Sequence, residues 1–205
     1  MAQDFWLLSR AAGLEAYALL FAAAVAGIAT STRLAARLRR AHLAFEVHRT
    51  LVWMALAATG LHVVALAGNR YAGLSAVQLV VPFLAPGRPV AAPLGILSLY
   101  ALLVLVASFS VRRRIGTRTW RALHHTTFAL FVAVSAHGLV AGPDAGRIAV
   151  RGLYAVALAA VALGAGYRLL APPLPPRARA PARGPGQPAP VSSFSADEAE
   201  RKRAA

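Results

Sequence analysis

Five long apolar stretches are the feature that most constrains this chain. A bilayer core of about 30 Å needs about 20 helical residues to cross it, and each stretch is long enough. None of them alternates polar with apolar residues as a barrel strand would, and inside lipid every backbone polar group must be bonded internally. With 58% hydrophobic and only 14% charged residues, we expect an all-α integral membrane bundle. The five expected transmembrane helices cover residues 13–32, 47–67, 92–111, 122–141 and 149–170.

Positive charge is concentrated in a few connections between these spans. The chain has 22 Lys and Arg against 7 Asp and Glu, a net charge of +15. In a soluble protein this excess would suggest nucleic acid, but in a membrane protein arginines gather in the cytoplasmic loops. We therefore expect an extracytoplasmic N-terminus, a cytoplasmic C-terminus, a bacterial plasma membrane and no nucleic-acid partner. The clustered arginines are Arg33, Arg37, Arg39, Arg40, Arg112, Arg113, Arg114, Arg118, Arg121, Arg177, Arg179 and Arg183.

The chain divides into three regions by composition. Residues 1–12 are expected to form a short extracytoplasmic N-terminus without a cleaved signal peptide, and residues 13–170 the membrane domain. Residues 171–205 are rich in Pro and Arg, cannot bury a core, and should form a disordered cytoplasmic tail. The segment 33–45 mixes apolar residues with arginines, which suits either a short amphipathic helix on the inner surface or a plain loop.

Five of the six histidines lie in two of the expected spans, and four of them form two pairs matched in depth. His48 and His62 are fourteen residues apart in the second span, and His124 and His137 are thirteen apart in the fourth. At about 1.5 Å per residue these separations are about 21 and 20 Å, so the histidines match in depth. We pair His48 with His124 as the inner pair and His62 with His137 as the outer pair. Ionisable residues inside a span are costly and mark function by default.

Paired imidazoles on facing helices suit one cofactor in particular. They present nitrogen ligands to both faces of a flat macrocycle, as in the bis-histidine haems of b-type cytochromes. The absence of cysteine excludes covalent c-type haem, thiolate zinc sites and iron–sulfur clusters. We therefore expect two haem b groups. His48 and His124 would bind the iron of one, and His62 and His137 the iron of the other. The alternative is a haem-free transporter or interaction subunit that uses the histidines as proton sites.

The thirteen-residue spacing in the fourth span conflicts with an ideal helix. On an ideal helix, two histidines fourteen residues apart point within about 40° of each other around the axis, whereas two histidines thirteen residues apart point about 140° apart. This span must be kinked or locally over-wound, or the haems must be laterally offset. Using His125 in place of His124 leaves about 120°, so only depth slightly favours His124. We expect His125 to pack at the inner interface and His42 to lie solvated in a loop.

Several segments resemble the ferric-reductase-like transmembrane domain. They are HRTLVWMALAATGLH, SFSVRRRIGTRTWRALHHTTFALF and SAHG. This domain is shared by ferric reductases, NADPH oxidases and the haem-binding membrane subunit of a bacterial methionine sulfoxide reductase system. The similarity extends from about Trp6 to Leu170 and implies that His48, His62, His124 and His137 are haem ligands, with the first histidine of the HH doublet bound.

The resemblance also implies electron transfer across the membrane, as one component of an oxidoreductase. Oxidase and reductase members carry a flavin and nicotinamide domain after the last helix, and here the tail of residues 171–205 follows instead. We therefore expect electrons from a cytosolic flavoprotein reductase or from quinol. The extracytoplasmic acceptor is left open between ferric iron, oxygen and a partner reductase.

Overall fold

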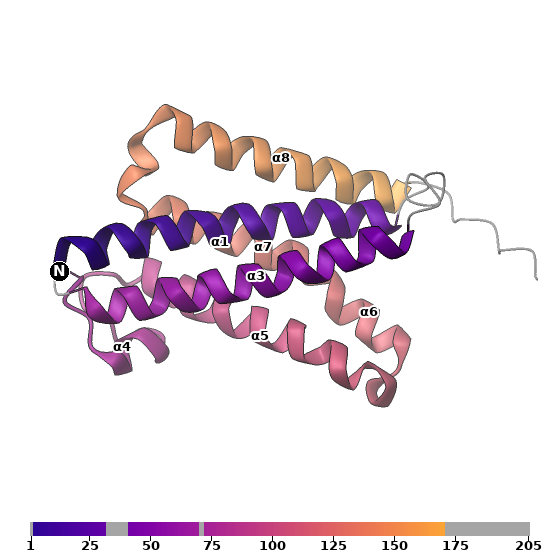
Figure 1. The fold of residues 1–205 in the computed structure, drawn as a ribbon, viewed down its shortest axis with the longest axis horizontal. Coiled ribbons are helices and arrows are strands. Elements are labelled where there is room, and N and C mark those ends of the chain that lie inside the picture. Colours follow the sequence, from indigo (N-terminus) through magenta and orange to yellow (C-terminus); the bar gives the residue numbers. More distant parts are fainter. Residues whose placement is uncertain (1, 32–40, 70–71, 171–205) are drawn as a thin grey trace, which may run out of the picture. The chain divides into compact units, whose positions relative to one another are not determined.

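The computed structural model describes residues 2–31, 41–69 and 72–170, which belong to one compact unit (Figure 1). The segment 32–40 and the tail from 171, for which the sequence predicts a surface segment and disorder, lie outside the described residues. No strand occurs in the part that is described, so the all-α prediction is confirmed. The elements are α1 (Ala2–Ser31), α3 (Ala41–Gly68), α4 (Ala76–Val80), α5 (Ala91–Ile115), α6 (Thr117–His125), α7 (Thr127–Ala141), η2 (Pro143–Gly146) and α8 (Ile148–Leu170).

The five predicted spans are present as helices long and apolar enough to cross a membrane. The start of α1, the short α4 and η2 lie at one end of the bundle, while α6 and the C-terminal end of α8 lie at the other (Figure 1). This is the arrangement expected when successive helices cross in alternate directions. The spans are Gln3–Thr30, His42–Gly68, Ala91–Ile115, Thr117–Ala141 and Ile148–Arg168.

Three helical spans begin five or more residues earlier than the apolar stretches indicated, those that start with α1, α3 and α6. Helix α1 starts at Ala2, so the expected separate segment 1–12 is almost entirely helical. Its polar residues lower the local hydropathy but have partners in the bundle, since the Ser9 hydroxyl donates to the Trp6 carbonyl and Arg10 pairs with Asp144. Helix α3 starts at Ala41, so His42 is an exposed residue of its first turn and not part of a loop.

An aromatic cluster fixes α1, α7 and α8 against one another. Tyr17 stacks on Phe131 with ring centroids 5.4 Å apart and lies 4.4 Å from the ring of Tyr154. The Tyr17 hydroxyl and the Ser135 hydroxyl are 3.1 Å apart in a buried hydrogen bond. Gly138 lies directly beneath Tyr154, where a Cβ atom would collide with the phenol. This packing leaves one side of α1 free to contact α3 along much of its length.

The fourth span is interrupted at Thr126, between α6 and α7. The Thr126 amide donates to the Leu123 carbonyl at 3.0 Å, an i to i−3 bond of the over-wound 3₁₀ type. The hydroxyls of Thr126 and Thr127 donate to the carbonyls of Leu123 and His124, both at 2.7 Å, and such bonds bend helices. The fourth span therefore carries a break with local over-winding at Thr126, as the thirteen-residue spacing predicted.

Candidate functional site

The structure brings the four predicted histidines together in two pairs. The rings of His48 and His124 have centroids 6.2 Å apart with an interplanar angle of 84°. Those of His62 and His137 are 6.5 Å apart with an angle of 82°. Helix α3 supplies one histidine to each pair, while α6 and α7 supply the others. We keep the names inner pair for His48 and His124 and outer pair for His62 and His137.

His125 takes no part in either pair. Its side chain is exposed and its ring stacks on Phe128, with centroids 6.5 Å apart and an interplanar angle of 17°. His124, the preceding residue, faces α3 instead. The structure therefore separates the two members of the doublet, which helical geometry alone hardly distinguished.

Both rings of the outer pair are held by backbone carbonyls of other helices. His62 Nδ1 lies 2.6 Å from the Ser9 carbonyl oxygen on α1, and His137 Nδ1 lies 2.8 Å from the Ala91 carbonyl oxygen on α5. A carbonyl can only accept, so each Nδ1 carries the hydrogen. In the neutral imidazole, Nε2 then keeps its lone pair and is available as a ligand.

A glycine accompanies each carbonyl that holds a histidine. Gly13 and Gly95 follow Ser9 and Ala91 by four residues, and a Cβ at these glycines would lie 2.9 and 2.6 Å from the nearest ring atoms of the outer pair. In a helix the carbonyl of residue i points toward the amide of residue i+4. A histidine that reaches this carbonyl therefore lies over residue i+4, where glycine leaves the room. We call this unit a carbonyl–glycine cradle.

The inner pair has one such cradle. His48 Nδ1 lies 2.8 Å from the Ala23 carbonyl oxygen, and a Cβ at Gly27 would lie 3.2 Å from the His48 ring. Ala23 and Ser9 are fourteen residues apart on α1, as are His48 and His62 on α3. One antiparallel register of α1 on α3 therefore builds both cradles.

Sequence reasoning missed these cradles, although a signal was present. Gly13 and Gly27 repeat the fourteen-residue spacing of the histidines in the following span. For two antiparallel neighbours, matched spacings of glycine and histidine indicate contact at two levels. No comparable repeat marks Gly95, which contributes to a single cradle.

His124 is held in a different way. No hydrogen bond from its ring to a carbonyl is found in the described part of the chain. Its ring stacks on Trp120, with centroids 5.0 Å apart and an interplanar angle of 18°. In the inner pair, a backbone carbonyl therefore holds the ring of His48, and the indole of Trp120 holds the ring of His124.

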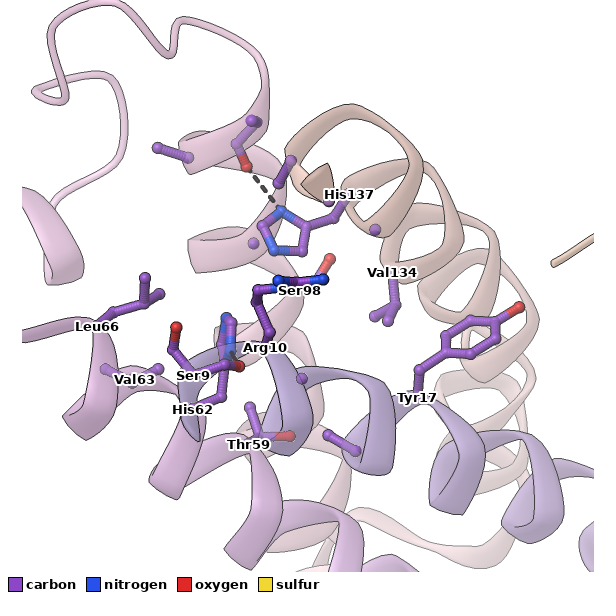
Figure 2. A pocket seen from close by; sticks show the side chains of 18 of the residues that line it. Ser9, Arg10, Tyr17, Thr59, His62, Val63, Leu66, Ser98, Val134 and His137 are labelled. Carbon is purple, nitrogen blue, oxygen red and sulfur yellow. Dashed lines mark hydrogen bonds between the residues drawn. The ribbon is translucent and has the colours of Figure 1, made fainter. Parts of the chain in front are cut away.

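A cavity of about 360 Å³ lies beside the outer pair, and His62 and His137 face it from opposite sides (Figure 2). Its volume falls in the range of small-molecule and cofactor sites, about 300–1,000 Å³. Most of the lining is apolar, but Arg10 and Ser98 also reach it. The Nε atom of Arg10 and the hydroxyl of Ser98 are buried, and neither has a hydrogen-bond partner among the described residues.

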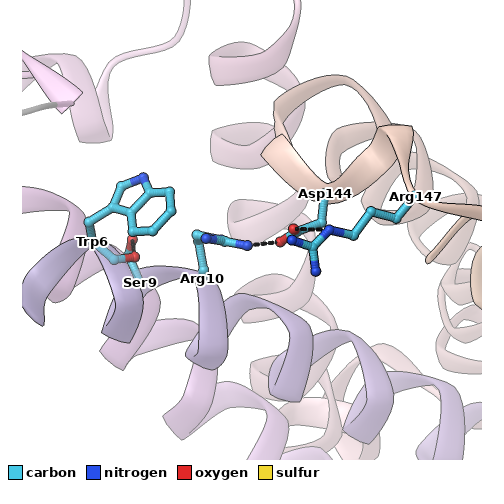
Figure 3. Close-up of polar contacts among 5 residues, drawn as sticks. All are labelled: Trp6, Ser9, Arg10, Asp144 and Arg147. Carbon is cyan, nitrogen blue, oxygen red and sulfur yellow. Dashed lines mark hydrogen bonds and ion pairs between the residues drawn. The ribbon is translucent and has the colours of Figure 1, made fainter. Parts of the chain in front are cut away.

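A charged network closes the same end of the bundle (Figure 3). Asp144 on η2 accepts from Arg10 on α1, and its other oxygen lies 3.2 Å from Arg147 Nε. The Arg10 guanidinium also lies over the Trp6 ring, 4.2 Å from the centroid. The network ties the connection between α7 and α8 to the first helix. Sequence reasoning gave no sign of it, because the partners are far apart and show no periodic pattern.

Each pair offers two nitrogen ligands and no more. Within residues 2–31, 41–69 and 72–170, no group of three or more His, Asp or Glu side chains converges as a metal site. A bare zinc ion takes about four ligands, so a pair alone does not complete such a site. A metal ion that is already bound in the plane of a macrocycle needs only two more ligands, which is the number that two facing imidazoles supply. Comparisons with protein-family models, curated proteins and solved structures found no match to this chain.

Proposed function

We propose that the chain is a membrane cytochrome b that binds two haems, one between the imidazoles of each pair, and carries electrons across the membrane. The observation that carries this proposal is the spacing of the rings. With iron–nitrogen bonds of about 2 Å and about 1.1 Å from nitrogen to ring centre, two axial imidazoles on one iron have centroids about 6.3 Å apart. The ring centroids of the inner and outer pairs, 6.2 and 6.5 Å apart, agree with this value.

The hydrogen bonds of the histidines add independent support. Metal-bound histidines almost always donate their other ring N–H to a carbonyl, carboxylate or water, which fixes the tautomer and raises ligand basicity. His48, His62 and His137 do so. A histidine that relays protons must exchange the hydrogen on either nitrogen. The haem-free alternative therefore has less support. Three of the four histidines donate their Nδ1 hydrogen to a backbone carbonyl, and a nearby glycine packs closely against each of these rings.

The haems would supply reversible one-electron chemistry at two levels of the bundle. The residues of this chain would supply orientation and an apolar setting. The cradles on α1 and α5 hold three of the imidazole rings, α3 sets the two levels, and the mostly apolar lining of the outer cavity would limit the access of water to a bound haem. These contributions are the ones expected of a protein around an electron-transfer cofactor.

We place the arginine-rich end of the bundle in the cytoplasm. Arg112, Arg113 and Arg114 end α5, and Arg118 and Arg121 lie on α6. Basic surfaces of this kind attract acidic partners and speed their association. A cytosolic flavoprotein reductase or a quinol would deliver electrons there, and an acceptor at the opposite end, whether ferric iron, oxygen or a partner reductase, would take them. The resemblance to the ferric-reductase-like domain supports this direction.

Electron transfer through vesicles tests the proposal. The purified protein, loaded with hemin, is reconstituted into liposomes that enclose ferricyanide, and dithionite is added outside. We expect the enclosed ferricyanide to lose its visible absorption at a rate that scales with the amount of protein. Protein-free vesicles and vesicles with the His62→Ala variant serve as controls. Equal rates with wild type and protein-free vesicles would overturn the proposal.

A further inference from the structure

The inner pair contains the one histidine of the four that lacks a carbonyl–glycine cradle. We propose that Trp120 is the positioning residue of His124, and that its stacked ring sets the plane of this ligand and thereby the electronic character of the inner haem. The inference deepens the proposed function and rests on it. It assigns a role to a residue that lies outside the ligand set.

The geometry of the stack carries the inference. Trp120 precedes His124 by four residues on α6, so the two side chains share one face of the helix. Their planes are 18° from parallel at a centroid distance of 5.0 Å, an offset stack of the kind aromatic rings favour. A flat indole on one face of the imidazole restricts its tilt. A stack does not select the protonated nitrogen, so His124 should be a less basic ligand than its cradled partner His48.

Trp120 belongs to a chain of aromatic rings that extends over two other helices. Phe109 on α5 meets it edge-on with centroids 6.1 Å apart, and Phe45 on α3 lies 6.1 Å from Phe109. The Arg112 guanidinium covers Phe109 at 3.9 Å and donates to the Phe109 carbonyl. The aromatic chain thus joins α3, α5 and α6 at the level of the inner pair. It compensates for the interruption at Thr126, which leaves α6 without a continuous helix to hold it.

Trp120 could act on His124 by stacking or through its indole N–H, and these two roles can be tested separately. Trp120 Nε1 is buried and has no partner within the described residues. If position 120 acts by stacking, a phenyl ring should replace the indole. The Trp120→Phe variant therefore keeps the proposed role, whereas Trp120→Ala removes it.

Electron paramagnetic resonance (EPR) of the oxidised, hemin-loaded protein tests the inference. The inner signal is the one missing from His48→Ala. In Trp120→Ala we expect this signal to shift and broaden, with about tenfold faster loss of the inner haem to apomyoglobin, as typical for a lost supporting contact. The outer signal should stay unchanged and reports that the chain is folded. Trp120→Phe should resemble wild type, and so should Trp53→Ala, which removes a tryptophan from an exposed position on α3.

Three results would count against the inference in distinguishable ways. An unchanged inner signal in a Trp120→Ala protein that retains two haems would overturn the positioning role alone. Equal shifts in Trp120→Phe and Trp120→Ala would overturn stacking in favour of the indole N–H. A wild-type protein that binds no hemin would overturn the proposed function together with this inference.

Discussion

The outer and inner pairs hold the same kind of side chain at nearly the same spacing by different means. In the outer pair both imidazoles donate to carbonyls of neighbouring helices and rest against glycine. In the inner pair only His48 does so, while His124 lies on a bent segment against Trp120. The difference follows from the helix packing. Where a neighbouring helix presents a glycine, its backbone can orient a histidine, and where none does, an aromatic side chain takes over the task.

The largest effect should come from removing the histidines themselves. His62→Ala and His137→Ala should each abolish the same haem, the outer one, while His48→Ala and His124→Ala should each abolish the inner one. A haem in that pair would lose one of its two protein ligands and would be held more weakly. Haem per chain and the number of low-spin EPR signals measure the outcome. His125→Ala is the control, and loss of the inner haem in this variant, with His124→Ala intact, would refute the pairing.

The glycine of a cradle should matter almost as much as its histidine. In Gly95→Ala the new Cβ would lie 2.6 Å from His137 Cε1, so the ring must move. We expect the outer haem to bind about 10- to 100-fold more weakly, the usual cost of disturbing groups that orient a ligand. Hemin titration measures this. Gly60→Ala gains the same helix propensity and meets nothing within 4 Å. Similar affinities for both variants would show that the cradle does not orient the ring.

The charged network should stabilise the outer end only. Asp144→Asn removes the charge that Arg10 and Arg147 share, and we expect a loss of about 2 kcal/mol in unfolding free energy, as for other hydrogen bonds to charged groups. Equilibrium unfolding in mixed detergent measures the change. Arg147→Gln should cost less than about 1 kcal/mol because this side chain is 76% exposed. A larger loss in Arg147→Gln than in Asp144→Asn would contradict this view of the network.

The smallest effect should come from the bend in the fourth span. The double variant Thr126→Val and Thr127→Val removes two side-chain bonds to carbonyls and should straighten the junction between α6 and α7. We expect the inner haem to leave about two- to threefold faster, since α6 then aims His124 less accurately. Haem transfer to apomyoglobin measures both sites. Faster loss of the outer haem alone would show that the bend serves the other pair.

Much of the architecture could be predicted from the sequence, because apolar length and histidine depth are one-dimensional signals. The five spans and the disturbance in the fourth span were readable in this way, whereas depth only slightly favoured His124 over His125 as the ligand. The helix starts were not, since Arg10 and His42 interrupt apolar runs that the backbone nevertheless continues. The ion pair of Arg10 with Asp144 depends on tertiary packing and leaves no periodic trace.

The carbonyl–glycine cradles were partly predictable from the sequence. Gly13 and Gly27 share the spacing of His48 and His62, so the antiparallel register of α1 on α3 was latent in the sequence. Recognising it requires knowing that α1 and α3 are neighbours. The roles of Gly95 and Trp120 are visible only from distances in the structure. Each contacts a single histidine ring, so no repeated spacing in the sequence marks it.

The low-temperature EPR spectrum of the oxidised protein, with spins counted against chains, tests the central claim most directly. The imidazole planes of the two pairs are near 84° and 82° to each other, and a haem held between such nearly perpendicular rings would give a strongly anisotropic low-spin signal. The account predicts two such signals of equal intensity, one for each histidine pair. A high-spin signal, a single low-spin centre per chain, or no haem signal after hemin loading would contradict it.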